Sequence, residues 1–173
     1  VYILLLRAAT SGRMPDADVE RWQKTKAELA PHDNSYVAQM ARGNTLSHRD
    51  WLVLNNERHA MRFRFAEFFR DWDILLTPAA ASAAWPHDQA DERRKRTITV
   101  NGHEVPTTDQ LFWAGFSGVV YLPSTVGPAG ILQSGLPVGC QAIAAHLHDR
   151  TAIRFAECVE REIGGFVPPH GYD

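Results

Sequence analysis

The sequence predicts an α/β fold with a mixed β-sheet flanked by helices. Segments whose apolar residues have helical spacing alternate along the chain with short, almost continuously apolar runs, and such runs are typical of strands covered on both faces. Hydrophobic residues make up 45% and charged residues 22% of the 173 residues, which suits a folded chain with one core. We therefore expect a single domain over residues 1–173.

Two helices are predicted between residues 15 and 43. Pro15 lies at a first-turn position ahead of several acidic residues, so a polar helix should run to about Ala30, where Pro31 ends it. A second, short helix should begin with Asn34 as its N-cap and end near Gly43. We expect this pair of helices to cover a core that the rest of the chain forms.

A long helix is predicted next. Residues 47–50 (Ser-His-Arg-Asp) form a variant of the capping box, and residues 51–72 contain no Gly or Pro. Apolar residues recur along this helix with helical spacing, at Met61, Phe65, Phe68, Phe69 and Trp72. We interpret this stripe as core packing rather than as a ligand platform, because the spacing is what burial against a sheet or helix requires.

The middle of the chain contains the first strand signals. Residues 73–78 (Asp-Ile-Leu-Leu-Thr-Pro) are a short apolar run closed by a proline, which predicts a buried strand followed by a surface loop. Residues 97–100 and 103–105 flank Asn101-Gly102, which supplies the two positive φ angles of a type I′ turn. A β-hairpin is therefore expected there.

Two strands are expected between the last two helices. Residues 122–126 and 136–145 are apolar runs that should form strands covered on both faces, joined by residues 127–130 (Gly-Pro-Ala-Gly) and by a second turn at Gly135. The preceding helix should be capped by one of the two threonines at 107–108 and end at Gly118. The closing helix should have Asp149 as its N-cap and end at residues 164–165 (Gly-Gly).

The charge of the chain gives no reason to expect nucleic acid or a membrane as a partner. The formal net charge is −2 and the pI is about 6.5. The one basic run, residues 93–96, follows two acidic residues and is interpreted as a solvated loop. The apolar residues 1–6 fall far short of the roughly 20 residues that span a bilayer. Cys140 and Cys158 have the spacing of neither a metal site nor a disulfide framework, so we expect two reduced cysteines in a cytoplasmic protein.

Four segments, in this order, resemble the C-terminal part of amidase signature enzymes. They are residues 73–78, residues 122–130 (Leu-Pro-Ser-Thr-Val-Gly-Pro-Ala-Gly), residues 135–141 (Gly-Leu-Pro-Val-Gly-Cys-Gln), and the closing helix with Ala156 and Glu160. The resemblance covers residues 47–173 and is closer to broad bacterial amidases than to amidotransferase subunits. It implies the C-terminal portion of the amidase signature fold. It also implies hydrolysis of a small carboxamide through an acyl-enzyme, by a serine nucleophile, a second serine and a lysine, without a metal or organic cofactor.

The sequence provides no catalytic residues for that reaction. Lys24, Lys26 and Lys95 lie in polar or charged segments, where none is expected to be buried enough to act as a neutral base. Ser117 lies in a Gly-Phe-Ser-Gly segment that only approaches a nucleophile elbow, because its second glycine comes one position too early. Since there is no initiator Met, we expect a fragment that lacks the N-terminal part of the same protein and is inactive alone.

The candidate site residues come from the predicted helix that precedes residue 118. The resemblance implies that this region borders the acyl-binding cleft, so Asp109, Trp113 and Phe116, on one helical face, are candidates for substrate binding. The alternative is that the two aromatic residues belong to the core and that Asp109 only occupies a first helical turn. Residues 146–149 (His-Leu-His-Asp) allow a metal site, but a strand end followed by an N-cap explains them more simply.

Other functions stay open. One alternative is a non-catalytic, amidase-derived binding or scaffold module, and another is an A-type subunit of a tRNA-dependent amidotransferase. A complete, unrelated α/β hydrolase would need a catalytic triad that these residues do not provide. Because the missing part would have covered apolar surface, the isolated chain is also expected to form a homodimer or to aggregate.

Overall fold

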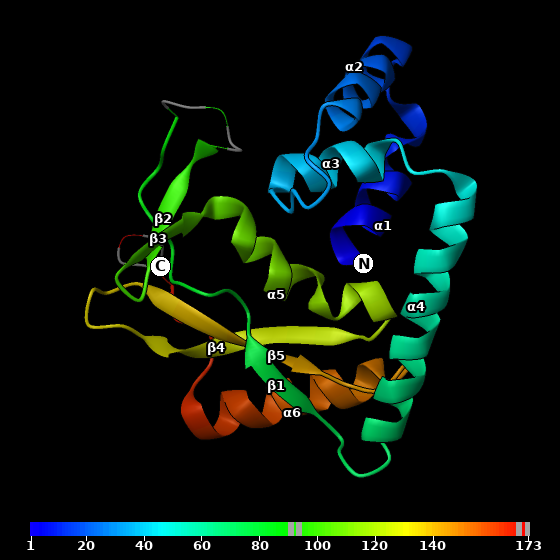
Figure 1. Ribbon diagram of the computed structural model, residues 1–173. Coiled ribbons are helices and arrows are strands. Elements are labelled where there is room, and N and C mark those ends of the chain that lie inside the picture. Colours follow the sequence, from blue (N-terminus) through cyan, green and yellow to red (C-terminus); the bar gives the residue numbers. More distant parts are fainter. Residues whose placement is uncertain (90–91, 93–94, 169–170, 172–173) are drawn as a thin grey trace. The chain divides into compact units, whose positions relative to one another are not determined.

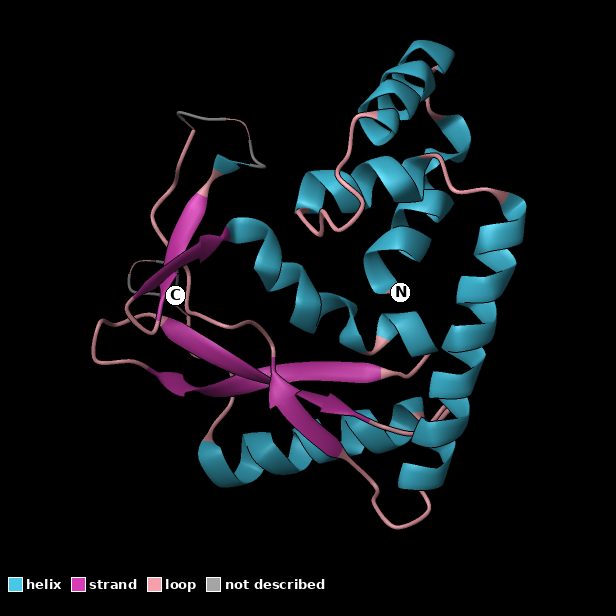
Figure 2. Ribbon diagram, in the orientation of Figure 1, coloured by secondary structure: helices cyan, strands magenta, loops and turns pink. Residues whose placement is uncertain are grey.

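The computed structural model describes residues 1–89, 92, 95–168 and 171, and Figures 1 and 2 show the course of the chain. Two compact units are present, Val1–Met61 and Arg62–Asp173. Arg93 and Arg94 of the basic run lie outside the described residues, so its interpretation as a solvated loop stays a prediction for them. The single domain expected over residues 1–173 likewise stays a prediction.

The first unit is helical, and the sequence predicts its helices from residue 16 onward but not the one at residues 2–10. It contains α1 (Tyr2–Thr10), the short 3-10 helix η1 (Ser11–Arg13), α2 (Asp16–Ala27) and α3 (Tyr36–Asn44), followed by the first part of α4 (His48–Phe68). Helix α1 packs closely on α3, where a Cβ atom added to Gly43 would lie 2.6 Å from the Cβ of Arg7. Leu5, Trp22, Ala38 and Ala41 are the buried apolar residues of the unit's core.

The N-cap of α3 differs from the prediction by one residue. Ser35, rather than Asn34, is the cap, and its hydroxyl oxygen accepts a hydrogen bond from the Ala38 N–H at 3.2 Å. The Asp33 carboxylate accepts the Ser35 N–H at 2.8 Å, which holds the chain so that Ser35 enters the cap position. Both bonds satisfy donors that a helix start would otherwise leave unpaired.

Helix α4 begins as the capping box predicts and ends earlier than expected. The Ser47 hydroxyl accepts a hydrogen bond from the Asp50 N–H at 3.1 Å and donates one to the Asp50 carboxylate at 2.7 Å. The α-helix stops at Phe68, and turns carry the chain onward to Trp72.

The prediction that the aromatic stripe of α4 is core packing is wrong for part of the stripe. Within His48–Phe68, all of which the structure describes, no residue is buried, and Phe68 and Trp72 are 36% and 62% exposed. Phe65 and Phe69 stack on each other, whereas Phe68 stacks on Trp72 in a second row. Only the first row reaches α5, through Phe65, so the second row stays at the surface.

The second unit contains a three-stranded sheet. Its order is β1 (Leu75–Pro78), β5 (Pro137–Ile143), β4 (Ser124–Ile131), and both pairings are antiparallel. The α/β class is confirmed, although no parallel pair of the expected mixed sheet occurs among the described strands. In Figure 1, α5 (Leu111–Phe116) and α6 (Asp149–Ile163) lie on opposite sides of this sheet. The buried core of the second unit includes Val120, Leu122, Ile143 and Ala152.

Strand β4 is longer than predicted. The Gly-Pro-Ala-Gly segment at 127–130 is not a connection but continues the strand, with a bulge between Pro128 and Gly130. A proline, which has no N–H to donate, is tolerated because β4 lies at an edge of the described sheet. The hairpin turn lies at residues 132–135, where the Gly135 N–H bonds to the Leu132 carbonyl at 2.9 Å. The second expected turn is thus confirmed.

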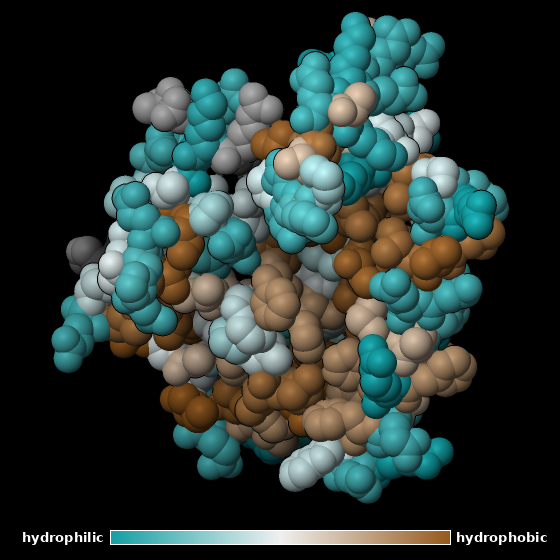
Figure 3. Space-filling view, in the orientation of Figure 1, coloured by the Kyte–Doolittle hydropathy of each residue, from teal (hydrophilic) through white to brown (hydrophobic). Residues whose placement is uncertain are grey.

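Burial on both faces of the last two strands is found only in the second half of β5. There Gln141, Ala142 and Ile143 are buried, whereas Val126 and Ile131 of β4 are 59% and 65% exposed. Figure 3 shows in brown the apolar side chains that remain at the surface of the face it draws. The prediction for β4 is therefore wrong.

The hairpin of β2 (Thr97–Val100) and β3 (His103–Pro106) is confirmed, with φ angles of 52° at Asn101 and 79° at Gly102. A 3-10 helix, η3 (Thr107–Gln110), leads from it into α5, and a second, η4 (Gly118–Val120), follows. Neither η3 nor α5 has a threonine side-chain cap. The Thr107 hydroxyl donates instead to the Arg96 carbonyl at 3.3 Å. His148, not Asp149, occupies the N-cap position of α6, whose predicted end at Gly164 is confirmed by a φ angle of 124°.

Candidate functional site

The three predicted site residues lie along η3 and α5. Asp109 is exposed in η3, and Trp113 and Phe116 are half-buried in α5. The Trp113 and Phe116 ring centroids lie 6.3 Å apart, and Phe116 meets Phe65 of α4 edge to face at 5.8 Å. The two aromatic residues therefore belong to an aromatic cluster that packs α5 on the C-terminal part of α4.

A buried glutamine fixes the backbone of this helix. Gln141 of β5 is 5% exposed, and its side-chain amide donates to the Thr77 hydroxyl at 3.1 Å and to the Trp113 carbonyl at 3.4 Å. One amide group thus joins β1, β5 and α5. No local pattern in the sequence predicts this role of Gln141, which closes the Gly-Leu-Pro-Val-Gly-Cys-Gln segment.

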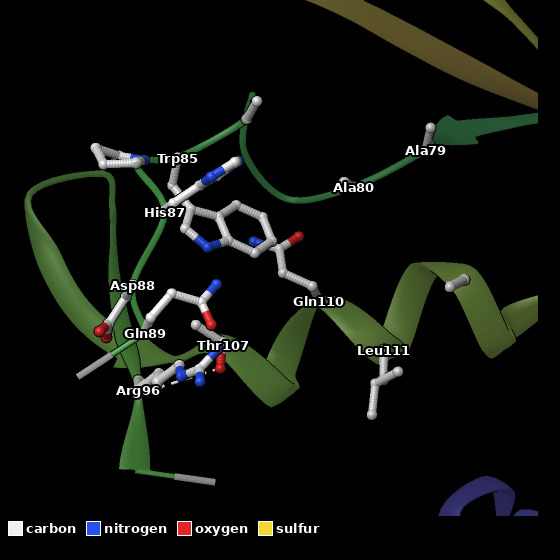
Figure 4. Close-up of a pocket in the computed structure, with 13 residues that line it drawn as sticks. Ala79, Ala80, Trp85, His87, Asp88, Gln89, Arg96, Thr107, Gln110 and Leu111 are labelled. Carbon is white, nitrogen blue, oxygen red and sulfur yellow. Dashed lines mark hydrogen bonds between the residues drawn. The ribbon is translucent and has the colours of Figure 1, made fainter. Parts of the chain in front are cut away.

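A pocket of about 570 Å³ lies beside the same helical stretch, between the loop that follows β1 and the residues of η3 and α5 (Figure 4). From the helical side it is lined by Gln110, Leu111 and Ala114. The pocket is not lined by Asp109, Trp113 or Phe116, although these residues belong to the same helical stretch. Their role in substrate binding therefore stays a prediction.

The loop side of the pocket comes from the segment after β1, which the sequence predicts only as a surface connection up to Arg96. Trp85 lines the pocket and is 42% exposed, and Asp88 and Arg96 place opposite charges on the wall. The signal available in the sequence is this tryptophan within a run of alanines and prolines, because an indole combines a large apolar surface with an N–H donor.

Gln110 ties the loop to the helix. Its side-chain oxygen accepts the Ala81 N–H at 2.8 Å, and its side-chain nitrogen donates to the Ser82 hydroxyl at 3.1 Å. These bonds link residues almost 30 positions apart in the chain. The Gln110 side chain therefore holds residues 81–82 of the loop against η3.

Two serines of the unit hydrogen-bond to each other. The hydroxyl oxygens of Ser117 and Ser124 lie 3.0 Å apart, and Ser117 is 5% exposed. A neutral hydroxyl is not a base that activates a serine, so within the described part of the chain this pair shows no proton acceptor of the kind that a nucleophile requires. Lys95 is exposed, as are Lys24 and Lys26 of α2.

The imidazole of His146 contacts the backbone of Tyr121. Its Nδ1 lies 2.8 Å from the Tyr121 carbonyl, and the Arg62 guanidinium lies over the Tyr121 ring, 4.9 Å from its centroid. Of the residues that the structure describes, no three or more His, Cys, Asp or Glu form a group able to hold a metal ion. Over the same residues, no helix has the length and apolar character needed to span a membrane.

Among the residues that the structure describes, the two side chains with a clearly shifted pKa lie outside these features. Hydrogen bonds from the Ser35 backbone and hydroxyl lower the pKa of the Asp33 carboxyl. The hydrogen bond to Glu157 raises the pKa of Arg154, which forms an exposed ion pair on α6.

Comparison with solved structures shows which known fold the chain shares. A bacterial aryl acylamidase of the amidase signature enzymes superposes with a TM-score of 0.65 at 18% identity, over 94% of this chain and 33% of that one. At this identity the likeness shows the fold. A model of the Amidase family matches residues 7–153, and the chain therefore belongs to that family.

Known relatives differ in function and are much longer. The A-type subunit of the glutamyl-tRNA(Gln) amidotransferase of Exiguobacterium is 30% identical over 112 residues, which are 65% of this chain and 21% of that protein. Human fatty-acid amide hydrolase 2 is 35% identical over 69 residues, or 39% of this chain and 13% of that protein. The chain thus spans about a fifth or less of the length of these relatives. The predicted resemblance to amidase signature enzymes is confirmed.

Proposed function

We propose that this chain is the C-terminal part of an amidase that hydrolyses the carbon-nitrogen bond of small carboxamides through a serine acyl-enzyme. The observation that carries the proposal is the Amidase family match over residues 7–153. The ordered segments at 73–78, 122–130 and 135–141 support it, and in the structure they form or adjoin β1, β4 and β5 of one sheet.

In this proposal the catalytic residues come from the N-terminal part of the same protein, outside this sequence. Amide hydrolysis needs an activated nucleophile and donors for the oxyanion. The Ser117–Ser124 pair supports an external origin, since its hydroxyls face each other rather than a base. The chain supplies sheet core and pocket wall, with Asp109, Trp113 and Phe116 as the substrate-contacting residues.

The intact mass of the purified protein, followed by amide hydrolysis assays, tests the proposal. The 173-residue chain alone is expected to hydrolyse no small carboxamide above background. A longer protein that contains it is expected to release ammonia or amine from such substrates. Turnover by the chain alone that disappears in the Ser117→Ala variant would contradict the proposal.

A second candidate function is that of an A-type subunit in a tRNA-dependent amidotransferase, favoured by the 30% identity to a protein of this kind over 112 residues. It is distinguished by the source of ammonia and by the partner. Such a protein should release ammonia from glutamine and function only with other subunits, whereas the proposed amidase should work on small carboxamides alone. A parent protein that carries no upstream serine and lysine segment would instead favour a non-catalytic binding or scaffold module.

The proposal places the protein in the cytoplasm. It is supported by Cys140 and Cys158, which form no disulfide in the structure. Fractionation of cells that produce the whole protein tests this assignment.

A further inference from the structure

The turn of the β2–β3 hairpin contains the one asparagine of the sequence that precedes a glycine. Asn101 is followed by Gly102, whereas the four other asparagines precede serine, threonine, asparagine or glutamate. An asparagine side chain and the next backbone nitrogen can close into a cyclic imide, and a glycine has no side chain that hinders this closure. The dipeptide at 101–102 is therefore the least hindered of its kind in the chain.

The structure leaves the reacting groups of this dipeptide accessible. Asn101 and Gly102 are both exposed, and a Cβ atom built on Gly102 would meet nothing within 4 Å. Within the described residues, no backbone carbonyl accepts the Gly102 N–H. The nitrogen that has to attack is thus not engaged in the backbone hydrogen bonds that the structure shows.

The tip of the hairpin can open without unfolding the rest of the unit. Each strand contains four residues, and Val100 with His103 is the last pair before the turn. The buried residue of β2 is Ile98, which is 7% exposed and lies away from the turn. Exposed ends with few buried contacts open locally more often than a core does. Asn101 can therefore leave the turn conformation and reach the geometry of ring closure.

Asn34 is a contrasting site in the same chain. It is exposed, as Asn101 is, and it also precedes a small residue, Ser35. The Ser35 N–H, however, donates to the Asp33 carboxylate at 2.8 Å, and Ser35 is fixed as the N-cap of α3. This nitrogen has to lose a hydrogen bond to a charged acceptor before it can attack. The three remaining asparagines lie in α3 and α4, where the helix fixes the backbone.

We infer that Asn101 is a site of spontaneous deamidation. The Gly102 nitrogen forms a bond to the side-chain carbonyl carbon of Asn101, and the bond from that carbon to the side-chain nitrogen breaks. The proton lost by Gly102 leaves with the side-chain nitrogen as ammonia. Water then opens the imide at either of its carbonyls, which gives aspartate or isoaspartate. The reaction consumes only water, and the inference does not depend on the proposed function.

Isoaspartate changes the length of the turn as well as its charge. Its main chain runs through the former side-chain carboxyl carbon and so gains one methylene group. The φ angles of 52° at Asn101 and 79° at Gly102 belong to a two-residue turn that holds Val100 opposite His103. The longer link no longer matches this pairing, so the modified hairpin is expected to open from its tip.

Peptide mapping by mass spectrometry, during incubation of the 173-residue chain at mildly alkaline pH, measures the modification. The Ser35→Gly variant is the matched control, because it makes residues 34–35 a second Asn-Gly dipeptide and glycine costs little at an N-cap. In this folded variant Asn101 should convert about tenfold faster than Asn34, since the N–H of residue 35 is held by Asp33. In urea the two sites should convert at equal rates.

Two outcomes of this comparison would overturn the inference: equal rates at the two sites in the folded variant, or conversion of Asn101 in urea alone. A second variant, Asn101→Gly, keeps a residue that accepts a positive φ angle but removes the side-chain amide. It should abolish the mass gain of this peptide, and a mass gain that persists would place the modification elsewhere.

Hydrogen exchange tests the effect on the hairpin. Amides of residues 97–106 should exchange faster in the isoaspartate form than in the Asn101→Asp variant, which adds the charge but keeps the length of the main chain. Equal exchange in these two forms would overturn the opening of the hairpin.

Discussion

The side-chain amide of Gln141 donates a hydrogen bond to the hydroxyl of Thr77 at 3.1 Å, inside the sheet that the two residues share. Replacing Gln141 by Leu should lower the free energy of unfolding by about 1–3 kcal/mol, because its two half-buried partners lose their donor. Urea denaturation measures this change. Gln133→Leu, at an exposed turn position, is the control and should change stability by less than about 0.5 kcal/mol.

Gly43 is expected to tolerate no side chain. A Cβ atom there would lie 2.6 Å from the Cβ of Arg7 and 3.1 Å from the carbonyl oxygen of Leu4, and both belong to α1. Gly43→Ala should therefore force α1 and α3 apart and lower stability by about 1–3 kcal/mol. Gly12→Ala meets nothing within 4 Å and serves as the matched control in thermal denaturation. A Gly43→Ala variant as stable as this control would contradict the packing described for α1 and α3.

Asp33 should make the stability of the first unit depend on pH. The hydrogen bonds from Ser35 lower the pKa of its carboxyl below the ordinary value of 3.8. A lowered pKa in the folded state means that the ionised carboxylate stabilises the fold fully above about pH 3.8 and loses this effect as the pH falls through the lower, folded pKa.

The Asp33→Ala variant measures this dependence. Its denaturation midpoint should lie below that of the parent chain at pH 6, and the difference should shrink as the pH falls below 3.8. Asp73→Ala, an exposed carboxylate before β1, is the comparison. A difference that grows on acidification would mean that the folded state raises the pKa of Asp33 instead of lowering it.

Strand β4 should drive self-association of the isolated chain. Val126 and Ile131 are 59% and 65% exposed on a strand at the edge of the described sheet, and such edges pair with other chains. Light scattering should reveal dimers or larger species. Replacing Ile131 by Lys should shift the population toward monomer, whereas Ile163→Lys, equally exposed on α6 at 68%, should shift it less. A monodisperse monomer of the parent chain would contradict the expectation.

Local sequence rules predicted the elements whose structure depends on near neighbours. The hairpin at Asn101-Gly102 follows from two φ angles, and the start of α4 follows from the bonds between Ser47 and Asp50. The N-cap of α3 at Ser35 also has a local cause, which is the hydrogen bond to the Asp33 carboxylate. The sequence alone does not decide it, because residues 33–35 (Asp-Asn-Ser) are all common N-cap residues.

Features that depend on distant parts of the chain were not predictable. The continuation of β4 through Pro128 depends on its register with Gly139, and the exposure of Phe68 depends on which side of α4 meets Phe116. The pocket is an extreme case, because Gln110 selects loop residues almost 30 positions away as its partners. No periodicity in the sequence encodes such a choice.

The strand order has a consequence for how the polypeptide acquires its structure during synthesis. Leu75 of β1 pairs with Ile143 of β5, so β1 leaves the ribosome long before its described partner exists. Until β5 emerges, β1 and its apolar side chains have no strand in this sheet to pair with. Non-local pairings of this kind fold slowly and leave strands open to wrong partners. Nascent chains that stop before residue 137 should therefore depend on chaperones that protect β1.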